Sequence, residues 1–329
     1  MTFATQPALA PAPRNLVEID LAPRAASLRA EVLGGLSDQP KSLPPKLFYD
    51  AHGAWLFTRI CATQAYYPTR TETGILLRHA AEIADAVGPA ATLVEPGAGD
   101  MRKIRLLLPA LRPLGYVPVD ISIEQLREEA RQLAREFPWL AITAIAADFQ
   151  APALQRLIAA QRGRRVLFFP GSTIGNFDRD GARAFLESAR RLLGEGAAFL
   201  VGIDLVKPVD ALTAAYDDAQ GVTAAFNLNL LTRINRELGA DFDLSAFRHR
   251  AVWNPLESRI EMHLESLKDQ SVHVAGRRFH FRVGETLHTE NSHKFTPEAF
   301  ARLAADAGWT LEETWISGEP TFAIVLLRA

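Results

Sequence analysis

Residues 93–103 read Leu-Val-Glu-Pro-Gly-Ala-Gly-Asp-Met-Arg-Lys, and this stretch decides the fold. An apolar run ends there in two closely spaced glycines, Gly97 and Gly99, and an amphipathic segment follows, which predicts a strand, a tight loop and a helix. A second apolar run, residues 116–119, ends in Asp120, twenty-one residues after Gly99. A doubly wound sheet places at that position the carboxylate that binds a ribose. Together these features predict a cofactor that carries a nucleoside.

The type of cofactor follows in part from what the loop lacks. The dinucleotide fingerprint has a third small residue three positions after its second glycine, and here that position is Arg102. No Gly-Lys-Ser/Thr phosphate loop follows, so a nucleoside without phosphates, such as S-adenosylmethionine, is favoured. The pattern Glu95-x-Gly97-x-Gly99 resembles the first motif of class I methyltransferases. Two glycines in an ordinary strand-to-helix turn would give the same pattern.

Composition excludes several classes of protein. The 329 residues, 48% of them hydrophobic, predict about two domains with sizeable cores. A formal charge of −2 argues against a nucleic-acid partner, which needs clustered cations. The single cysteine, Cys61, excludes an internal disulfide and fits a reducing compartment. Residues 1–14 lack the features of a signal peptide, and no apolar run approaches the roughly 20 residues that cross a bilayer. We therefore expect a cytoplasmic monomer without a membrane partner.

Regular alternation of strands and helices covers the first two thirds of the chain. A helix is expected over residues 71–87, and five strands separated by helices follow, which predicts a parallel α/β sheet. These strands are residues 91–94, 116–120, 141–146, 165–169 and 197–203, and the helices run up to residue 111 and over residues 123–137, 151–161 and 178–193. The ligand then lies at the carboxyl edge of the sheet.

The pattern changes after Asp204. A helical stretch over residues 208–238 leads into segments of period two, with Ile260, Met262 and Leu264 on one strand face and a hairpin turning at Gly276. A helix over residues 296–307 and strands over 309–316 and 322–328 return to the first sheet. The predicted division is a flexible tail (1–20), a cofactor domain with an N-terminal helical segment (21–206 plus 296–329) and an inserted substrate-binding domain (207–295).

Five short motifs occur in a fixed order and carry a family resemblance. They are Ser-Leu-Pro-Pro-Lys (42–46), Tyr-Tyr-Pro-Thr-Arg (66–70), Gly-Ser-Thr-Ile-Gly-Asn (171–176), Ala-Tyr-Asp-Asp-Ala (215–219) and Arg-Ile-Glu-Met (259–262). From about Lys41 to its last residue, the chain resembles the histidine-specific Nα-methyltransferases of ergothioneine biosynthesis. Those enzymes use S-adenosylmethionine to trimethylate free L-histidine. The resemblance implies a Rossmann-like, doubly wound class I methyltransferase sheet with an inserted α+β substrate-binding domain.

The resemblance also implies a set of cofactor contacts: Tyr49, Gly97, Lys103, Asp120, Asp148 and Phe149. The residues themselves support part of this set. Asp120 can accept both ribose hydroxyls, and Asp148 and Phe149 follow the third strand, where a carboxylate and a ring can bind adenine. Lys103 rests on the resemblance alone. No metal is expected, because the eight histidines lack the i, i+4 spacing of a helical zinc site.

For the substrate, the resemblance implies Tyr66, Gly171, Asn176, Tyr216, Met262, Glu290, Asn291 and Ser292. Asn176 and Tyr216 can donate to a carboxylate. Glu290 can accept from an imidazole N–H, and Ser292 can complete the pair, which predicts the selection of histidine. A site built on such hydrogen bonds rejects analogues that lack the group by roughly 10⁴-fold or more.

Each of these residues, taken alone, could also have a purely structural role. Tyr66 fits a packing aromatic, Asn176 a helix cap before Asp178, Met262 a core residue and Glu290 a solvated strand end. The loop also departs from the family pattern at Pro96 and residues 100–102, and His293 replaces an expected Cys.

Three other functions stay open on the sequence. They are Nα-methylation of another, indolic amino acid, a nicotinamide-dependent oxidoreductase, and a non-catalytic binding protein. For the methyl transfer itself, Tyr49 or a water route is expected to help remove the proton of the α-ammonium group.

Overall fold

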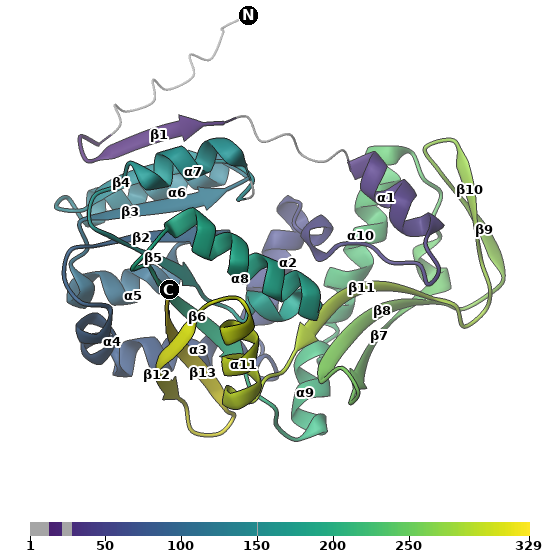
Figure 1. Ribbon diagram of the computed structural model, residues 1–329. Helices are drawn as coiled ribbons and strands as arrows, with labels where there is room; N and C mark the ends of the chain where they lie inside the picture. The colour runs from purple at the N-terminus through teal and green to yellow at the C-terminus, as the bar shows by residue number, and fades with distance from the viewer. Residues whose placement is uncertain (1–12, 22–27, 150) are drawn as a thin grey trace, which may run out of the picture.

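The computed structural model describes residues 13–21, 28–149 and 151–329, and its centre is a sheet of eight strands (Figure 1). The strand order is β1-β4-β3-β2-β5-β6-β13-β12. β13 is antiparallel to both of its neighbours, and β1 to β6 are parallel to one another. This confirms the predicted class I arrangement with one reversed strand. The strands are β1 (Leu16–Asp20), β2 (Ala91–Pro96), β3 (Gly115–Asp120), β4 (Ala141–Ala146), β5 (Arg164–Phe169), β6 (Ala198–Asp204), β12 (Thr310–Ile316) and β13 (Phe322–Arg328).

Helices cover both faces of this sheet, because its strands are apolar on both sides. Leu93 and Val94 are adjacent in β2, and they belong to two different apolar cores. The core around Leu93 is closed by α3 (Tyr67–Arg78), α4 (Ala80–Val87), α5 (Arg102–Leu111) and α6 (Ile123–Glu136). The core around Val94 is closed by α7 (Pro152–Ala159), α8 (Arg179–Leu193) and α11 (Pro297–Asp306).

A third apolar core lies beside the sheet and holds the inserted segment (Figure 1). It contains a three-stranded antiparallel sheet in the order β11-β8-β7 and a separate hairpin of β9 and β10. Its elements are α9 (Val209–Tyr216), α10 (Val222–Leu238), the 3₁₀ helix η3 (Leu244–Ala246), β7 (Phe247–Asn254), β8 (Arg259–Ser266), β9 (Gln270–Val274), β10 (Arg277–Phe281) and β11 (Thr286–His293). The predicted hairpin at Gly276 is present, and it forms a two-stranded sheet separate from β11-β8-β7.

The N-terminal helices pack into this third core and not against the eight-stranded sheet. They are α1 (Leu28–Ser37), the 3₁₀ helix η1 (Pro45–Phe48) and α2 (Ala51–Ala62). Val32, Phe48 and Ile60 are buried there together with Leu212 and Phe226 of the insertion. The predicted first domain, which began at residue 21, therefore does not match the packing. Residues 28–62 precede the eight-stranded sheet in sequence, but they pack into the third core together with the inserted segment.

The predicted tail over residues 1–20 is wrong for its last part. Leu16–Asp20 form β1, which pairs with β4 in parallel, while residues 1–12 lie outside the described part of the chain. A five-residue strand with two acidic residues carries little sequence signal. Glu18 forms an ion pair with Arg131 of α6 at 2.7 Å, so contacts distant in sequence hold this edge strand.

Two of the predicted helices are interrupted. The helix over residues 71–87 is two helices, α3 and α4, which meet at His79. The stretch over 208–238 breaks between α9 and α10, where Gly221 adopts a φ of 70°. Glycine adopts this left-handed conformation readily, and Gly221 stands directly before the first residue of α10. The break places Tyr216 at the end of α9.

Candidate active site

The carboxyl ends of five adjacent parallel strands bring the chemistry-bearing residues to one edge. Asp148 follows β4, Asp120 ends β3, Gly97 follows β2, Gly171 follows β5 and Asp204 ends β6. Ligands of doubly wound sheets bind at this edge. Residues from both predicted sets, cofactor and substrate, therefore share one side of the sheet.

The glycine loop is held against Asp120. The Gly97 N–H donates to the Val119 carbonyl at 2.8 Å, and the Gly99 N–H lies 3.4 Å from Oδ2 of Asp120. Gly97 has a φ of 64°, and a Cβ added there would meet nothing within 4 Å. The carboxylate thus stands beside an open stretch of backbone, as a ribose-binding group should.

Lys103 was expected only from resemblance, and its surroundings give it a clear structural role. Its ammonium lies 2.5 Å from Oε2 of Glu72, a fully buried residue of α3. Both oxygens of Glu72 also accept from the Gly171 N–H, at 2.8 and 2.9 Å. Glu72 therefore links the first helix after the glycine loop to the loop that follows β5.

Asp148 and Phe149 lie at the end of β4, next to the end of β3. The Ala147 N–H donates to the Asp120 carbonyl at 3.0 Å, which holds the two strand ends together. The Phe149 ring lies 5.6 Å from the ring of Phe185 in α8. A part-buried ring is thus available beside Asp120.

Aromatic side chains from distant parts of the chain form one cluster. Tyr66 and Tyr216 meet edge to face at 6.1 Å, and Phe57 lies 6.1 Å from Tyr66 and 5.7 Å from Tyr49. Phe226 of α10 completes the group, 5.9 Å from Tyr49. Tyr49 was assigned to the cofactor, and the structure places it beside the residues expected to bind substrate.

The hydroxyls of Tyr216 and Ser292 lie 2.6 Å apart and share a buried cation. That cation is Lys294, which the sequence analysis missed. Its ammonium also pairs with Asp204 at 2.8 Å. The available signal was its spacing, because Lys294 lies two residues beyond Ser292 and strand side chains alternate with period two.

Glu290 faces Met262 across the paired strands β11 and β8. Burial raises the pKa of Glu290 to about 7, although the positive charge of Lys294 opposes the shift. Among the described residues, none donates a hydrogen bond to this carboxylate. Met262 is only 2% exposed, so it is a core residue that also lies opposite Glu290. Asn291 is different, because its Oδ1 contacts Nε2 of His288 at 2.9 Å and its side chain does not join the cluster.

Asn176 ends the short 3₁₀ helix η2 (Thr173–Asn176), which packs against β11. A Cβ on Gly175 would come within 2.9 Å of the His293 carbonyl, so only glycine permits this approach. Asp178, and not Asn176, caps α8 through the Gly181 N–H at 2.7 Å. The alternative role of Asn176 as a helix cap is therefore excluded.

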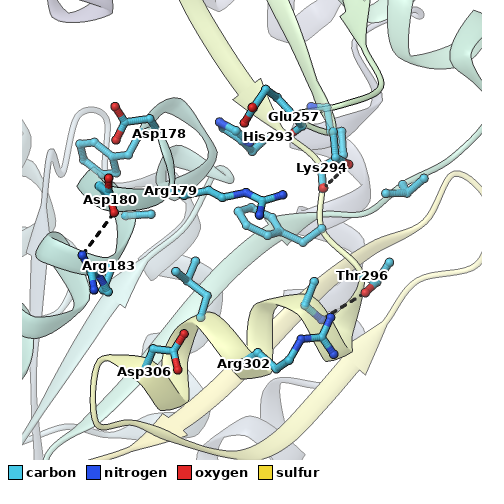
Figure 2. Close-up of a pocket in the computed structure, with 17 residues that line it drawn as sticks. Asp178, Arg179, Asp180, Arg183, Glu257, His293, Lys294, Thr296, Arg302 and Asp306 are labelled. Carbon is cyan, nitrogen blue, oxygen red and sulfur yellow. Dashed lines mark hydrogen bonds and ion pairs between the residues drawn. The ribbon is translucent and has the colours of Figure 1, made fainter.

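A pocket of about 500 Å³ lies between α8, α11 and the end of β11 (Figure 2). Arg179, Arg302 and His293 line it, and none of the predicted site residues does. Acidic residues, among them Asp178 and Asp306, alternate with the arginines around it. Lys294 also lines this pocket and contacts Tyr216, so the pocket adjoins the cluster at Tyr216 and Glu290.

Metal chemistry was not expected, and the described residues contain no group of three or more His, Cys, Asp and Glu side chains that could hold an ion. The same part of the chain has no helix of sufficient length and apolarity to span a bilayer.

Comparison with known proteins identifies close relatives of the chain. A family described as "Histidine-specific methyltransferase, SAM-dependent" matches residues 28–329. Histidine N-alpha-methyltransferase of Mycolicibacterium smegmatis is 44% identical over 308 residues, which cover 92% of this chain and 95% of that protein. The Mycobacterium tuberculosis protein of the same name is 43% identical and covers 91% and 94%. Ergothioneine biosynthesis protein 1 of Neurospora crassa is 28% identical, over 85% of this chain and 32% of that protein.

Proposed function

Because the chain belongs to the SAM-dependent, histidine-specific methyltransferase family, we propose that it methylates the α-amino nitrogen of L-histidine. Three successive transfers give Nα,Nα,Nα-trimethyl-L-histidine (hercynine), the first step of ergothioneine biosynthesis. One observation carries the substrate assignment. Glu290, a carboxylate without a protein hydrogen-bond donor in the described chain, stands on the same strand as Ser292, whose hydroxyl is held by Tyr216.

The chain's residues fit S-adenosylmethionine. Asp120 offers a carboxylate to the ribose, the open backbone at Gly97 allows close approach, and Phe149 offers a ring to the adenine. When bound, the cofactor would supply an electrophilic methyl group: the amine nitrogen forms the new bond to the methyl carbon, the carbon–sulfur bond breaks, and S-adenosylhomocysteine leaves as a neutral thioether. Lys103 and Glu72 then act by holding the glycine loop and the Gly171 loop in one arrangement.

The substrate contacts assign a group to each end of histidine. Asn176 and Tyr216 can donate to the α-carboxylate, and Glu290 can accept from the imidazole N–H. Ser292, which was expected to complete the imidazole pair, is hydrogen-bonded to Tyr216, so we assign it to the carboxylate side. Glu290 is partly exposed in the ligand-free protein, and an apolar side chain in place of imidazole would shield it from water without a hydrogen bond, which costs binding free energy. An indolic substrate is less suited to the pair of Glu290 and Met262 for the same reason.

We assign Tyr49 to the substrate amine because its ring belongs to the same aromatic cluster as Tyr66 and Tyr216, and its protonation state limits its role. Burial, together with the charge of Glu290, raises the pKa of Tyr49. The side chain is 45% exposed, which favours a smaller shift, but any upward shift leaves the phenol protonated at neutral pH. Tyr49 therefore accepts a hydrogen bond from the amine and orients it, and the proton leaves through water. The surrounding rings favour the amine as it becomes a permanent cation.

A competition experiment tests this function. The purified protein is incubated with S-adenosylmethionine and an equimolar mixture of the twenty amino acids, and the products are identified by mass spectrometry. We expect a gain of three methyl groups on histidine alone. Methylation of another amino acid would overturn the role of Glu290, and no methylation would favour a binding protein. A cytoplasmic location and a monomeric state remain proposals, which fractionation and light scattering can test.

A further inference from the structure

One buried ammonium contacts both hydroxyls of the proposed substrate site. Nζ of Lys294 lies 3.0 Å from the Tyr216 oxygen, 2.7 Å from the Ser292 oxygen and 2.8 Å from Oδ2 of Asp204. The Lys294 side chain is fully buried. A lysine ammonium has three N–H donors and no acceptor, so these three contacts use all of its protons.

The contacts of Lys294 determine how the two hydroxyls can be oriented. Both oxygens accept from Lys294, and they also lie 2.6 Å from each other, so one hydroxyl must donate to the other. Each hydroxyl has a single proton. The pair therefore keeps one O–H that is not used by another described residue, and the contact with Lys294 restricts the directions in which this O–H can point.

The carboxylate of Asp204 keeps Lys294 charged and in place. Burial is the largest single influence on Lys294 and would lower its pKa, but the charge of Asp204 and the interactions with Tyr216, including the hydrogen bonds to both, together outweigh burial and raise the pKa. Asp204 is itself fixed at the end of β6, where its Oδ2 accepts from the Tyr67 hydroxyl at 2.6 Å and its Oδ1 lies 2.5 Å from the ammonium of Lys207. The ammonium of Lys294 is thus anchored to the central sheet.

We infer that Lys294 is a positioning residue that directs the one free O–H of the Tyr216–Ser292 pair to the α-carboxylate of the amino-acid substrate. The inference rests on the proposed function, which places the substrate at this pair. A carboxylate suits the position because hydrogen bonds to an ionised acceptor are stronger than neutral ones. A hydroxyl that accepts from an ammonium is also polarised toward donating.

Lys207 provides a matched control. It is as buried as Lys294 and pairs with the same carboxylate, but its other contacts are the Leu205 carbonyl and the Tyr67 ring, and not Tyr216 or Ser292. Lys207→Met and Lys294→Met each remove one of two buried cations from Asp204. A purely structural role predicts similar effects for both variants, and a positioning role does not.

The experiment measures KM and kcat of the wild type and both variants with L-histidine and with L-histidinamide, which has no carboxylate. We expect Lys294→Met to raise KM for histidine by about 10- to 100-fold, the usual loss for a hydrogen bond to a charged group. KM for S-adenosylmethionine should stay within about twofold of the wild-type value. The preference for histidine over histidinamide, measured as the ratio of their kcat/KM values, should fall by a factor of about 10 or more. Lys207→Met should retain the wild-type preference.

Equal losses in the two variants, or an unchanged preference in Lys294→Met, would overturn the inference. If Lys294→Met fails to fold, as judged by its binding of S-adenosylhomocysteine, Lys294→Gln replaces it in the same comparison, because Gln keeps two N–H donors without the charge. A wild-type protein that does not methylate histidine would instead refute the proposed function, so the two failures are distinguishable.

Discussion

Glu290 is the residue on which the proposed selection of histidine depends, and its ionisation should be visible in binding. Its pKa of about 7 means that the carboxylate is replaced by the neutral acid as the pH falls below 7. A neutral acid is a weaker acceptor for the imidazole N–H. We expect the ratio of histidine Kd values for Glu290→Gln and the wild type to fall from pH 8 to pH 6. Calorimetric titration in the presence of S-adenosylhomocysteine measures it, and the ratio cancels the titration of histidine itself. A pH-independent ratio would contradict this role.

The same carboxylate should cost stability when it is charged in the ligand-free protein. Its pKa in the folded state lies above the unfolded value of about 4.3, so stability is lost as the pH rises between these two values. The Tm of Glu290→Gln minus the Tm of the wild type should therefore increase as the pH rises from 5 to 8. Thermal unfolding at several pH values measures this, and a constant difference would show that burial does not perturb Glu290.

Tyr49 should affect orientation more than proton transfer. Tyr49→Phe removes the hydroxyl and keeps the ring, which contacts Phe57 and Phe226. Loss of one hydrogen bond to the amine predicts a decrease in kcat of about tenfold. The shape of the pH profile should not change, because the phenol is not the base. Unchanged turnover from pH 6 to 9 would remove Tyr49 from the mechanism altogether.

Single residues show where prediction from the sequence reached its limit. Glu290, Ser292 and Tyr216 could be named because they interrupt apolar stretches and match family motifs. Lys294 was missed, because its spacing from Ser292 was its only signal and its partner Asp204 is distant in sequence, so that only the folded chain brings the two together. Glu72 was missed for the same reason, because its contacts with Lys103 and Gly171 cross three separate elements.

Among the elements, α3 connects the two halves of the site through Glu72. Glu72→Gln would lose the charge that pairs with Lys103 and would disturb one bond to Gly171. We expect the Kd for S-adenosylmethionine to rise by about tenfold or more, because a buried partner of a charged group is removed. Glu82→Gln on α4 is the control, since Glu82 is 62% exposed and its ion pair is worth little. Equal effects of the two substitutions would contradict the link.

The edge strand β1 should contribute to stability through the residue that precedes it. Asn15 donates from Nδ2 to the carbonyls of Ala134, Phe137 and Leu140, at 3.2, 3.2 and 2.8 Å. These carbonyls lie at and beyond the end of α6, where helices leave acceptors unpaired. Asn15→Ala should lower the free energy of unfolding by about 1–3 kcal/mol. Chemical denaturation measures this, and a loss below about 0.5 kcal/mol would show that β1 is held by other contacts.

Apolar periodicity was sufficient to predict the central parallel strands of the sheet, but it did not predict the edge strand β1 or two strands of the inserted segment. β2 to β6 are mostly apolar runs and were predicted within two residues of their observed ends. β1 was missed because it is short and acidic. β7 and β11 were missed because polar residues interrupt their alternation, and in β11 a bulge between His288 and Glu290 also shifts the register.

At the scale of the whole molecule, the site lies between the eight-stranded sheet and the third apolar core, which contains the inserted segment. Gly97, Asp120 and Asp204 stand at the edge of the eight-stranded sheet, and Tyr216 and Glu290 come from the inserted elements. The sequence predicted the insertion but not that the N-terminal helices would join it, because apolar periodicity does not say which core a helix faces. Lys294 and Glu72 are the buried residues that tie the substrate side to the sheet.

The most direct test of this account is a crystal structure with S-adenosylhomocysteine and L-histidine bound. We predict that the histidine amine lies about 5 Å from the sulfur, because it must stand about 3–3.5 Å from the methyl carbon that the sulfur carries before transfer. The imidazole should meet Glu290, and the carboxylate should meet the hydroxyl pair of Tyr216 and Ser292. Histidine bound in the pocket of Figure 2, or with its imidazole away from Glu290, would contradict the account.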